Sequence, residues 1–507
     1  MKEQLALLPG YLAAHLALTL VALALGVAVS VPLGILVTRF RSFEGPVLGA
    51  ASVIQTIPSL ALLAFMIPLL AAIGVRSIGY MPALIGLFLY SLLPVLRNTV
   101  AGLSAIDPAV IEAARGVGMT PGEQLRRVEL PLALPVIVAG IRTAAVWTVG
   151  TATLSTPVGA PSLGDYIFSG LQTRNYSAVL VGCAASAALA LLLDGLVRGL
   201  SAGVMRRSRR IVGLCLAAFG ALAVFAAAPT VRRLAASPGA TVTVGAKTFT
   251  EQYILSRIVA GRIARETGLS ARALDSLGST VAFDALRSGE IDAYVDYSGT
   301  LAMSVLGRTD VGTDRAALLR DVERGVAARY GVRVVAALGF ENTYALTMRR
   351  ADAERLGVRR IGDLTAHAGK LRIGGDYEIF QRPEWRSIEG AYRISFADKR
   401  SMDPSLLYEA ARTAQVDVIT AFSTDGRIVA YDLVVLEDDR HAIPPYDAVV
   451  LVSERFGAAH PDAVDALRGL ANAIDEGRMR QMNAAVDDRK ESPAAVAERF
   501  LDAMGRR

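Results

Sequence analysis

The hydrophobic pattern of this 507-residue chain changes near residue 240. Before that point, apolar residues gather in six long stretches, near residues 12–38, 47–73, 81–103, 132–154, 177–197 and 211–228. A helix of roughly 20 apolar residues crosses a bilayer core of about 30 Å, so the pattern predicts a helical membrane domain. Pro58, Pro68 and Pro94 fall inside these stretches, where they predict either kinked gate segments or plain helix irregularity.

Beyond residue 240, short β-branched runs alternate with amphipathic helical stretches. Strands are expected near residues 241–245, 291–295, 332–336, 371–373, 416–420 and 433–436, and helices at 251–266 and 281–288. The stretch from 461 to 504 has a helical pattern with no strand signal. This alternation predicts an α/β domain with mostly parallel sheets and enough length for two lobes.

Charge separates the halves at the same place. Residues 1–240 hold 17 basic residues (Lys and Arg) and 8 acidic residues (Asp and Glu). The remainder holds 36 basic and 39 acidic residues. The positive surplus lies in the apolar half, where it indicates membrane orientation and no nucleic-acid partner. With two cysteines and four histidines, we expect no disulfide framework, no metal site and no cofactor. The chain also lacks a GxxxxGK[ST] phosphate loop, so it is not expected to hydrolyse a nucleotide in that manner.

Arginines in the short loops predict the orientation of the spans. The loops after the first, third and fifth stretches carry Arg39, Arg41, Arg115, Arg126, Arg127, Arg198, Arg206, Arg207, Arg209 and Arg210. The alternate loops carry only Arg76 and Arg174. We therefore expect the Arg-rich loops to be cytoplasmic, and both the N-terminus and everything after the sixth stretch to be outside. Arg232 and Arg233, just beyond the sixth stretch, oppose this arrangement.

The sixth stretch has two interpretations. Residues 206–210 followed by 211–228 have the charged and apolar regions of a signal peptide, with small residues at the end. Pro229 stands where cleavage would occur and disfavours it. We favour an uncleaved anchor over a cleaved signal.

Residues 112–131 carry a spaced motif on a predicted cytoplasmic loop. Three residues separate Glu112, Ala113 and Ala114 from Gly118, and nine residues separate Gly118 from VELP. This resembles the EAA loop of ABC importer permeases, with Val128 in the place of Ile. The resemblance implies a coupling helix within 109–131 that contacts a separate ATPase subunit. The alternatives are an amphipathic helix on the membrane surface and, for Glu112 alone, an ordinary solvated carboxylate.

The apolar half resembles osmoprotectant permeases over nearly all of residues 10–205, including QTIPS at 55–59 and TPVG at 156–159. The resemblance implies an all-α type I ABC importer permease domain at 1–205 with five spans. Residues 206–240 then form a sixth transmembrane helix and a linker. With one EAA loop in each chain, two copies per transporter are expected.

The second half carries a series of motifs in a fixed order. They are GAKTFTEQ at 245–252, GEIDAYVDYSGT at 289–300, NTYAL at 342–346, AFSTDGRI at 421–428, LEDD at 436–439 and PPY at 444–446. Together they resemble the substrate-binding proteins for glycine betaine, carnitine and choline. The resemblance implies a two-lobed, type II periplasmic-binding-protein fold at 241–507. We place lobe 1 at about 241–348 and 447–507, and lobe 2 at about 349–446.

Proteins of that family hold a trimethylammonium group in a cage of aromatic rings between the lobes. A quaternary ammonium has no hydrogen to donate, so ring faces and shape must provide selectivity. Tyr297 and Tyr344 match the motif tyrosines most closely, and Tyr408 and Tyr446 are further candidates. The alternative for each is a core tyrosine with a satisfied hydroxyl.

Polar candidates lie at strand ends and helix starts, where side chains converge on a cleft. Gln252, Thr424 and Asp425 occupy such positions, although Thr424 or Asp425 could instead only shape the turn at Gly426. The planar fork of Arg382 could hold a ligand carboxylate. A solvated loop arginine is the alternative.

One departure from the family pattern bears on the ligand. Glu341 precedes NTYAL where relatives commonly have Asn. A carboxylate in the cleft could accept hydrogen bonds from N–H groups such as those of ergothioneine, and the fusion of permease and binder also resembles ergothioneine importers. Glu341 could equally attract a cation or face solvent.

These resemblances imply the permease and substrate-binding subunit of a bacterial inner-membrane ABC importer, with its C-terminal domain outside the cytoplasm. The ligand would be glycine betaine, choline, carnitine or ergothioneine, and the ATPase a separate partner. The other classes considered are a membrane-anchored receptor or sensor, a secondary transporter, an importer of an unrelated small cation or amino acid, and an enzyme. An enzyme is disfavoured because no motif combines nucleophile, base and orienting group.

Overall fold

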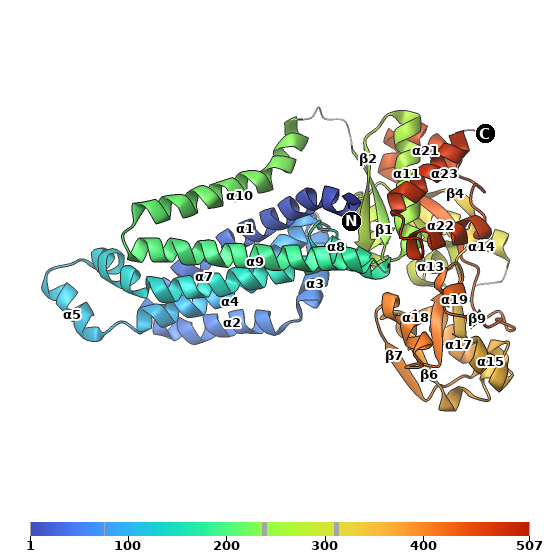
Figure 1. The fold of residues 1–507 in the computed structure, drawn as a ribbon, viewed down its shortest axis with the longest axis horizontal. Coiled ribbons are helices and arrows are strands. Elements are labelled where there is room, and N and C mark those ends of the chain that lie inside the picture. Colours follow the sequence, from blue (N-terminus) through green and yellow to red (C-terminus); the bar gives the residue numbers. More distant parts are fainter. Residues whose placement is uncertain (1, 76, 174, 236–240, 309–313, 506–507) are drawn as a thin grey trace. The chain divides into compact units, whose positions relative to one another are not determined.

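The computed structural model describes residues 2–75, 77–173, 175–235, 241–308 and 314–505 (Figure 1). Its contacts divide the chain into a membrane unit, Met1–Gly170 with Tyr176–Pro238, and an α/β unit, Leu171–Asn175 with Gly239–Arg507. Arg76, Arg174 and linker residues 236–240 lie outside the described residues, as do the side chains of Arg232 and Arg233. Each unit is described by itself.

The membrane unit is built from helices. Their bounds are α1 (Lys2–Arg39), α2 (Glu44–Thr56), α3 (Ser59–Ala72), α4 (Tyr80–Ser104), α5 (Pro108–Gly116), α6 (Pro121–Gln124), α7 (Leu130–Ala152), α8 (Gly164–Gln172), α9 (Tyr176–Met205) and α10 (Arg209–Ala235). Among the described residues, five helical segments are long and apolar enough to cross a membrane, or up to six if one bent pair counts as a span. These segments correspond to the six apolar stretches of the sequence.

The bent pair is the second predicted span. Helices α2 and α3 meet at an angle of 100°, so this stretch is not one continuous helix. The break follows from Pro58, whose ring pushes the preceding residue out of the helical region. Ile57 accordingly has the extended backbone angles φ −68° and ψ 128°. Pro68 and Pro94 instead lie within α3 and α4.

The first sheet of the α/β unit has the strand order β2-β1-β3-β10-β4. Its strands are β1 (Val242–Lys247), β2 (Ala271–Leu277), β3 (Ala293–Tyr297), β4 (Val332–Glu341) and β10 (Asp447–Ser453). Packed with it are α11 (Thr250–Thr267), α12 (Ser279–Ser288), α14 (Arg315–Tyr330), α20 (Glu454–Ala459), α21 (Pro461–Arg468), α22 (Glu476–Asp487) and α23 (Pro493–Gly505). The C-terminal helices α21, α22 and α23 return to contact α11, so the last part of the chain completes this lobe (Figure 1).

The second sheet has the order β7-β6-β8-β5-β9. Its strands are β5 (Tyr344–Arg349), β6 (Arg372–Gly375), β7 (Asp398–Ser401), β8 (Val418–Phe422) and β9 (Leu433–Val435). The accompanying helices are α15 (Arg350–Leu356), α16 (Ile361–Leu364), α17 (Pro383–Tyr392), α18 (Pro404–Arg412) and α19 (Arg427–Ala430). Trp385 and Ile388 of α17 lie in the core of this lobe.

Two features of the sheets differ from the sequence-based expectation. Both sheets are mixed, because β10 runs antiparallel to β3 and β4, and β5 runs antiparallel to β8 and β9. In addition, β5 belongs to the second sheet, so the chain changes lobe between Glu341 and Tyr344 and not near residue 348. The chain returns to the first lobe just before β10. Short connections of this kind let the two lobes pivot about them.

Candidate functional site

Five aromatic rings form a continuous cluster where the chain passes between the lobes. The ring of Phe249 lies 6.2 Å from Tyr297 and 5.3 Å from Phe422, stacked on both. Tyr344 continues the series, with its ring 5.1 Å from Phe422 and 5.8 Å from Tyr446. We call these five residues the aromatic cluster. It unites three of the four candidate tyrosines with two phenylalanines that had not been singled out.

Secondary structure places these rings at strand ends. Tyr344 and Phe422 are paired neighbours at the start of β5 and the end of β8, and Tyr297 ends β3. Tyr446 immediately precedes β10. Gly299 leaves room for it, because a Cβ at that position would lie 2.6 Å from the Tyr446 ring.

A buried carboxylate lies beside the cluster. Glu251, in the first turn of α11, accepts hydrogen bonds from the Tyr297 hydroxyl at 2.6 Å and from Asn342 Nδ2 at 3.0 Å. Its other oxygen accepts from Thr424 Oγ1 at 2.6 Å and Asn483 Nδ2 at 3.3 Å. Burial raises the pKa of Glu251, whereas these hydrogen bonds oppose the rise. Thr424 follows a strand of the second lobe, so the carboxylate joins the two lobes.

Gln252 has internal partners for its amide group. Its Nε2 donates to the Val295 carbonyl and to the Tyr297 hydroxyl, each at 3.1 Å, and its Oε1 accepts from the Lys247 backbone N–H. It therefore holds β1 and β3 in register around Tyr297. Next to it, Lys247 and Asp296 form a buried ion pair.

Arg382 lies among carboxylates and over a ring. Its guanidinium donates to Glu384 Oε1 at 2.7 Å and to Ser304 Oγ of the first lobe at 3.2 Å. The same group lies 5.6 Å from the centre of the Tyr344 ring. Tyr446 also donates to Glu384 Oε1, at 2.7 Å. Although burial acts in the opposite direction, the hydrogen bond and charge of Arg382 lower the pKa of Glu384.

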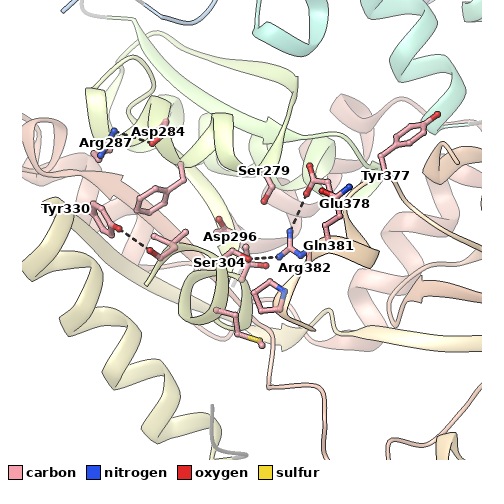
Figure 2. A pocket seen from close by; sticks show the side chains of 15 residues that line it. Ser279, Asp284, Arg287, Asp296, Ser304, Tyr330, Tyr377, Glu378, Gln381 and Arg382 are labelled. Atoms are coloured by element: carbon pink, nitrogen blue, oxygen red, sulfur yellow. Dashed lines mark hydrogen bonds and ion pairs between the residues drawn. The ribbon is translucent and has the colours of Figure 1, made fainter. Parts of the chain in front are cut away.

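A cavity of about 580 Å³ opens next to Arg382, between the lobes. Its lining includes Asp284, Arg287, Asp296 and Ser304 of the first lobe and Glu378 and Arg382 of the second, and Figure 2 shows Ser304 in contact with Arg382. Phe283 and Tyr330 contribute an edge-to-face aromatic pair to its wall. Of the candidate binding residues, Arg382 is the one that lines this cavity.

Glu341 is engaged in an ion pair. Its Oε1 lies 2.6 Å from Arg315 Nε, and its Oε2 accepts from the Tyr446 backbone N–H at 3.4 Å. Arg315 also pairs with Asp447 at 2.5 Å. Burial raises the pKa of Glu341, and the charge of Arg315 opposes that rise. Glu341 thus stands beside the aromatic cluster at Tyr446, with its carboxylate facing Arg315.

Tyr408 and Asp425 lie apart from the rings of the cluster. The Tyr408 hydroxyl accepts from the Phe422 backbone N–H at 3.3 Å, within a hydrophobic core of the second lobe. Asp425 pairs with Arg427 through three contacts, of 2.9, 3.2 and 2.6 Å, and this guanidinium lies 4.0 Å from the centre of the Tyr408 ring. Although burial acts against it, the charge of Arg427 lowers the pKa of Asp425.

Sequence reasoning missed several residues of this arrangement. Phe249 and Glu251 stand inside the quoted motif at 245–252, and Phe422 stands inside 421–428, so attention to every motif position would have found them. Asn483 and Glu384 lie outside the quoted motifs. Only the folded chain brings Asn483 to the site, whereas Glu384 stands two residues after the candidate Arg382 and could have been found beside it.

In the membrane unit, the predicted coupling residues occupy α5 and the turn after it. The Asp107 side chain caps α5 by accepting from the Ala109 backbone N–H at 2.9 Å. Glu112 and Ala113 are exposed, Ala114 is buried, and Gly118 adopts φ +80° in the turn. Val117, between Glu112 and Gly118 on this segment, is 74% exposed.

Comparison with known proteins covers both units. The family described as the substrate binding domain of ABC-type glycine betaine transport systems matches residues 240–503. The family described as the binding-protein-dependent transport system inner membrane component matches residues 30–206.

Individual relatives agree with these matches. An ergothioneine transport permease/ergothioneine binding protein of Helicobacter pylori is 31% identical over 480 residues, covering 92% of this chain and 84% of the relative. A choline transport system permease protein of Bacillus subtilis is 46% identical over 36% of this chain and 80% of its own length. A carnitine transport binding protein of Listeria monocytogenes is 31% identical over 52% of this chain and 86% of its own length.

Family membership makes this chain a transport protein and not an enzyme, in a system whose ATPase is a separate subunit. The chain belongs to the family of ABC importer subunits that join an inner-membrane permease component to a substrate-binding domain of the glycine betaine type.

Proposed function

We propose that this chain imports a small quaternary ammonium or betaine compound, with glycine betaine, choline, carnitine and ergothioneine as the candidates. The aromatic cluster carries the proposal. Ring faces attract a cation that has no N–H to donate, by roughly 0.5–2 kcal/mol per ring depending on desolvation. The guanidinium of Arg382 over the Tyr344 ring is an internal example of such a contact.

The residues proposed to contact the ligand form two groups. Tyr297, Tyr344 and Tyr446 would surround the cation, together with Phe249 and Phe422. Arg382 would hold a ligand carboxylate at the adjoining cavity, provided that it exchanges its contact with Glu384. Gln252, Thr424 and Asp425 would act through the hydrogen bonds that position these rings and lobes, and Tyr408 through the backbone of Phe422.

Calorimetric titration of the purified full chain with the four candidates tests the ligand class. We expect one of them to bind, and Tyr344→Leu to weaken that binding at least tenfold. Tyr377→Leu is the matched control, because Tyr377 lines the cavity but lies outside the aromatic cluster. Binding that depends on Tyr377 and not on Tyr344 would place the ligand in the cavity, and binding of none of the four would overturn the class.

Glu341 separates the candidates. Ergothioneine carries ring N–H groups, so its binding would require the Glu341 carboxylate to turn from Arg315 towards the cluster. We expect Glu341→Asn to weaken ergothioneine binding and to leave betaine or choline binding nearly unchanged. An equal effect on every ligand would make Glu341 a structural partner of Arg315 only.

The membrane unit would transmit ATPase movement through α5. Glu112, Ala113, Ala114 and Gly118 would seat in the ATPase subunit together with the exposed Val117, which has no other cover within the described chain. Two copies of the chain would line one pathway, in contact with membrane lipid. The Arg-rich loops support a cytoplasmic α5 and an extracytoplasmic α/β unit in a bacterial inner membrane.

Co-purification tests the assembly. The full chain is expected to retain its ATPase, in a complex with two copies of each subunit by native mass spectrometry. A membrane-impermeant thiol reagent should reach a cysteine placed at Val117 only from the cytoplasmic side of the membrane. It should reach a cysteine placed in the α/β unit only from the opposite side. A chain that binds ligand but retains no ATPase would favour a receptor or sensor.

A further inference from the structure

A groove between two helices of the membrane unit combines cationic and apolar walls. It encloses about 280 Å³ and lies between α7 and α9, which run alongside one another (Figure 1). Its charged lining consists of Arg142 on α7, Arg198 on α9 and Arg206, directly after α9. Pro135, Val138 and Met205 contribute apolar surface.

The positive charge of this groove exceeds its negative charge. Asp194 accepts from Arg142 Nε at 2.7 Å and from Arg198 Nη2 at 2.8 Å, so one carboxylate serves two guanidinium groups. Arg206 is exposed and forms no ion pair within the part of the chain that the structure describes. The arginines of the groove therefore carry two positive charges beyond what Asp194 balances.

This charge lies where exposure to hydrocarbon is unfavourable. The Arg198 side chain is 65% exposed, and Arg198 stands two turns before the end of α9, about 10 Å at 1.5 Å per residue. Ionised side chains within a span need a partner, or must reach the interface along their own length. Arg198 and Arg206 stand about two turns apart, so both can direct their guanidinium groups towards the end of α9.

We propose that this groove binds the phosphate group of an anionic phospholipid. A guanidinium presents parallel N–H donors that match two phosphate oxygens, and Arg198 and Arg206 would supply them. The acyl chains would lie along Val138 and Met205. Asp194 orients Arg142 and Arg198 through its hydrogen bonds without cancelling both charges. A basic pocket between spans is a suitable site for such a headgroup.

The apolar wall distinguishes a lipid from a soluble anion, and the net charge distinguishes lipid types. Free phosphate would gain nothing from Val138 or Met205. A zwitterionic lipid such as phosphatidylethanolamine would bring an ammonium group against the arginines. Phosphatidylglycerol, with a single negative charge, is therefore the expected occupant class.

Native mass spectrometry of the purified full chain tests this, with phosphatidylglycerol and phosphatidylethanolamine supplied in equal amounts. We expect the wild type to retain phosphatidylglycerol about tenfold more often than phosphatidylethanolamine. This ratio corresponds to a difference in binding free energy of about 1.4 kcal/mol. Arg198→Gln with Arg206→Gln should reduce the ratio to near one. The control, Arg209→Gln with Arg210→Gln, removes the same charge near the same end of the span but outside the groove lining, and should keep it.

Two further measurements complete the test, one on a single variant and one that compares lipid with inorganic phosphate. Arg198 pairs with Asp194, so the double variant can lose structure for that reason; Arg206→Gln alone breaks no ion pair and should still lower the ratio severalfold. In detergent, phosphatidylglycerol should raise the unfolding temperature and millimolar inorganic phosphate should not. An unchanged ratio in the groove variants, an equal loss in the control, or full replacement of the lipid by phosphate would overturn the proposal.

Discussion

The Thr424 hydroxyl donates a 2.6 Å hydrogen bond to Oε2 of Glu251, and this bond joins the two lobes of the α/β unit. Both residues are buried, with exposed fractions of 2%. Asn483 strengthens the junction, because its Nδ2 donates to the same carboxylate and to the Thr424 carbonyl at 3.1 Å. Separating the lobes at this point would break these bonds and expose the buried carboxylate.

Thr424→Val should therefore shift the equilibrium towards the open form. The substitution keeps the shape and removes one donor from a buried acceptor, which costs about 1–3 kcal/mol. We expect faster ligand release, measured by stopped-flow competition. Thr413→Val is the control, since Thr413 is exposed directly after α18 and its hydroxyl donates to the Glu409 carbonyl of that helix. An unchanged release rate would show that this contact persists in the open form.

Asp487 predicts a pH dependence of stability. Burial raises its pKa to about 7 from an ordinary value of 3.8, and the neighbouring Asp425 adds to the rise, whereas Arg427 and Lys490 oppose it. The folded chain then holds a proton that the unfolded chain releases near pH 4. The contribution of Asp487 to the free energy of unfolding should therefore fall as pH rises from about 4 to about 7 and stay level above pH 7.

Asp487→Asn should remove most of this slope, because the amide does not titrate and can still accept from Thr250 Oγ1, now 2.7 Å away. Scanning calorimetry of both proteins from pH 5 to pH 8 is the measurement, with roughly one pH unit between points. Parallel curves for the two proteins would assign the slope to other groups.

Gly299→Ala tests how the Tyr446 ring is placed. The new Cβ would lie 2.6 Å from the ring, so the ring must move and leave Glu384. We expect ligand affinity to fall tenfold or more, about 1.4 kcal/mol, with a smaller loss of stability. Gly390→Ala meets nothing within 4 Å and serves as the control in the same calorimetric titration. Equal affinities in all three proteins would exclude Tyr446 from the site.

The buried pair of Lys247 and Asp296 should be sensitive to the loss of one partner. Lys247→Met leaves a carboxylate with 1% side-chain exposure without its counter-charge, a loss of about 3–5 kcal/mol. Arg468→Gln removes an exposed pair with Asp465 and should change stability by less than about 1 kcal/mol. Thermal unfolding of the full chain compares the Lys247→Met and Arg468→Gln variants. An equal loss of stability in both variants would mean that water reaches Asp296.

Gly118→Ala tests the coupling turn. An alanine at φ +80° is strained by about 1–2 kcal/mol, so the turn after α5 should rearrange. Ligand-stimulated ATP hydrolysis of the assembled transporter should drop while ligand affinity stays constant. Gly122→Ala, at an ordinary φ with open space around the new Cβ, should behave as wild type. Full stimulation in the Gly118 variant would remove this turn from the coupling route.

Local patterns were sufficient for much of the architecture. Apolar length predicted the spans, and Pro58 marked the place where the second one breaks, because a proline effect acts on its immediate neighbour. Alternating β-branched and helical runs predicted most strands and the helical C-terminal stretch. Each of these signals depends on residues close together in the chain.

The partners of individual side chains required the tertiary structure. Glu341 pairs with Arg315, and the Tyr408 side chain lies in the core of the second lobe, contacts that the neighbouring residues in the chain do not predict. The antiparallel insertion of β10 next to β3 brings Tyr446 to Gly299, residues far apart in sequence. Sequence alone determined the class of protein, the apolar spans and most of the strands. Only the folded chain decided which charges neutralise one another and which rings share a face, because such contacts join residues that no local pattern relates.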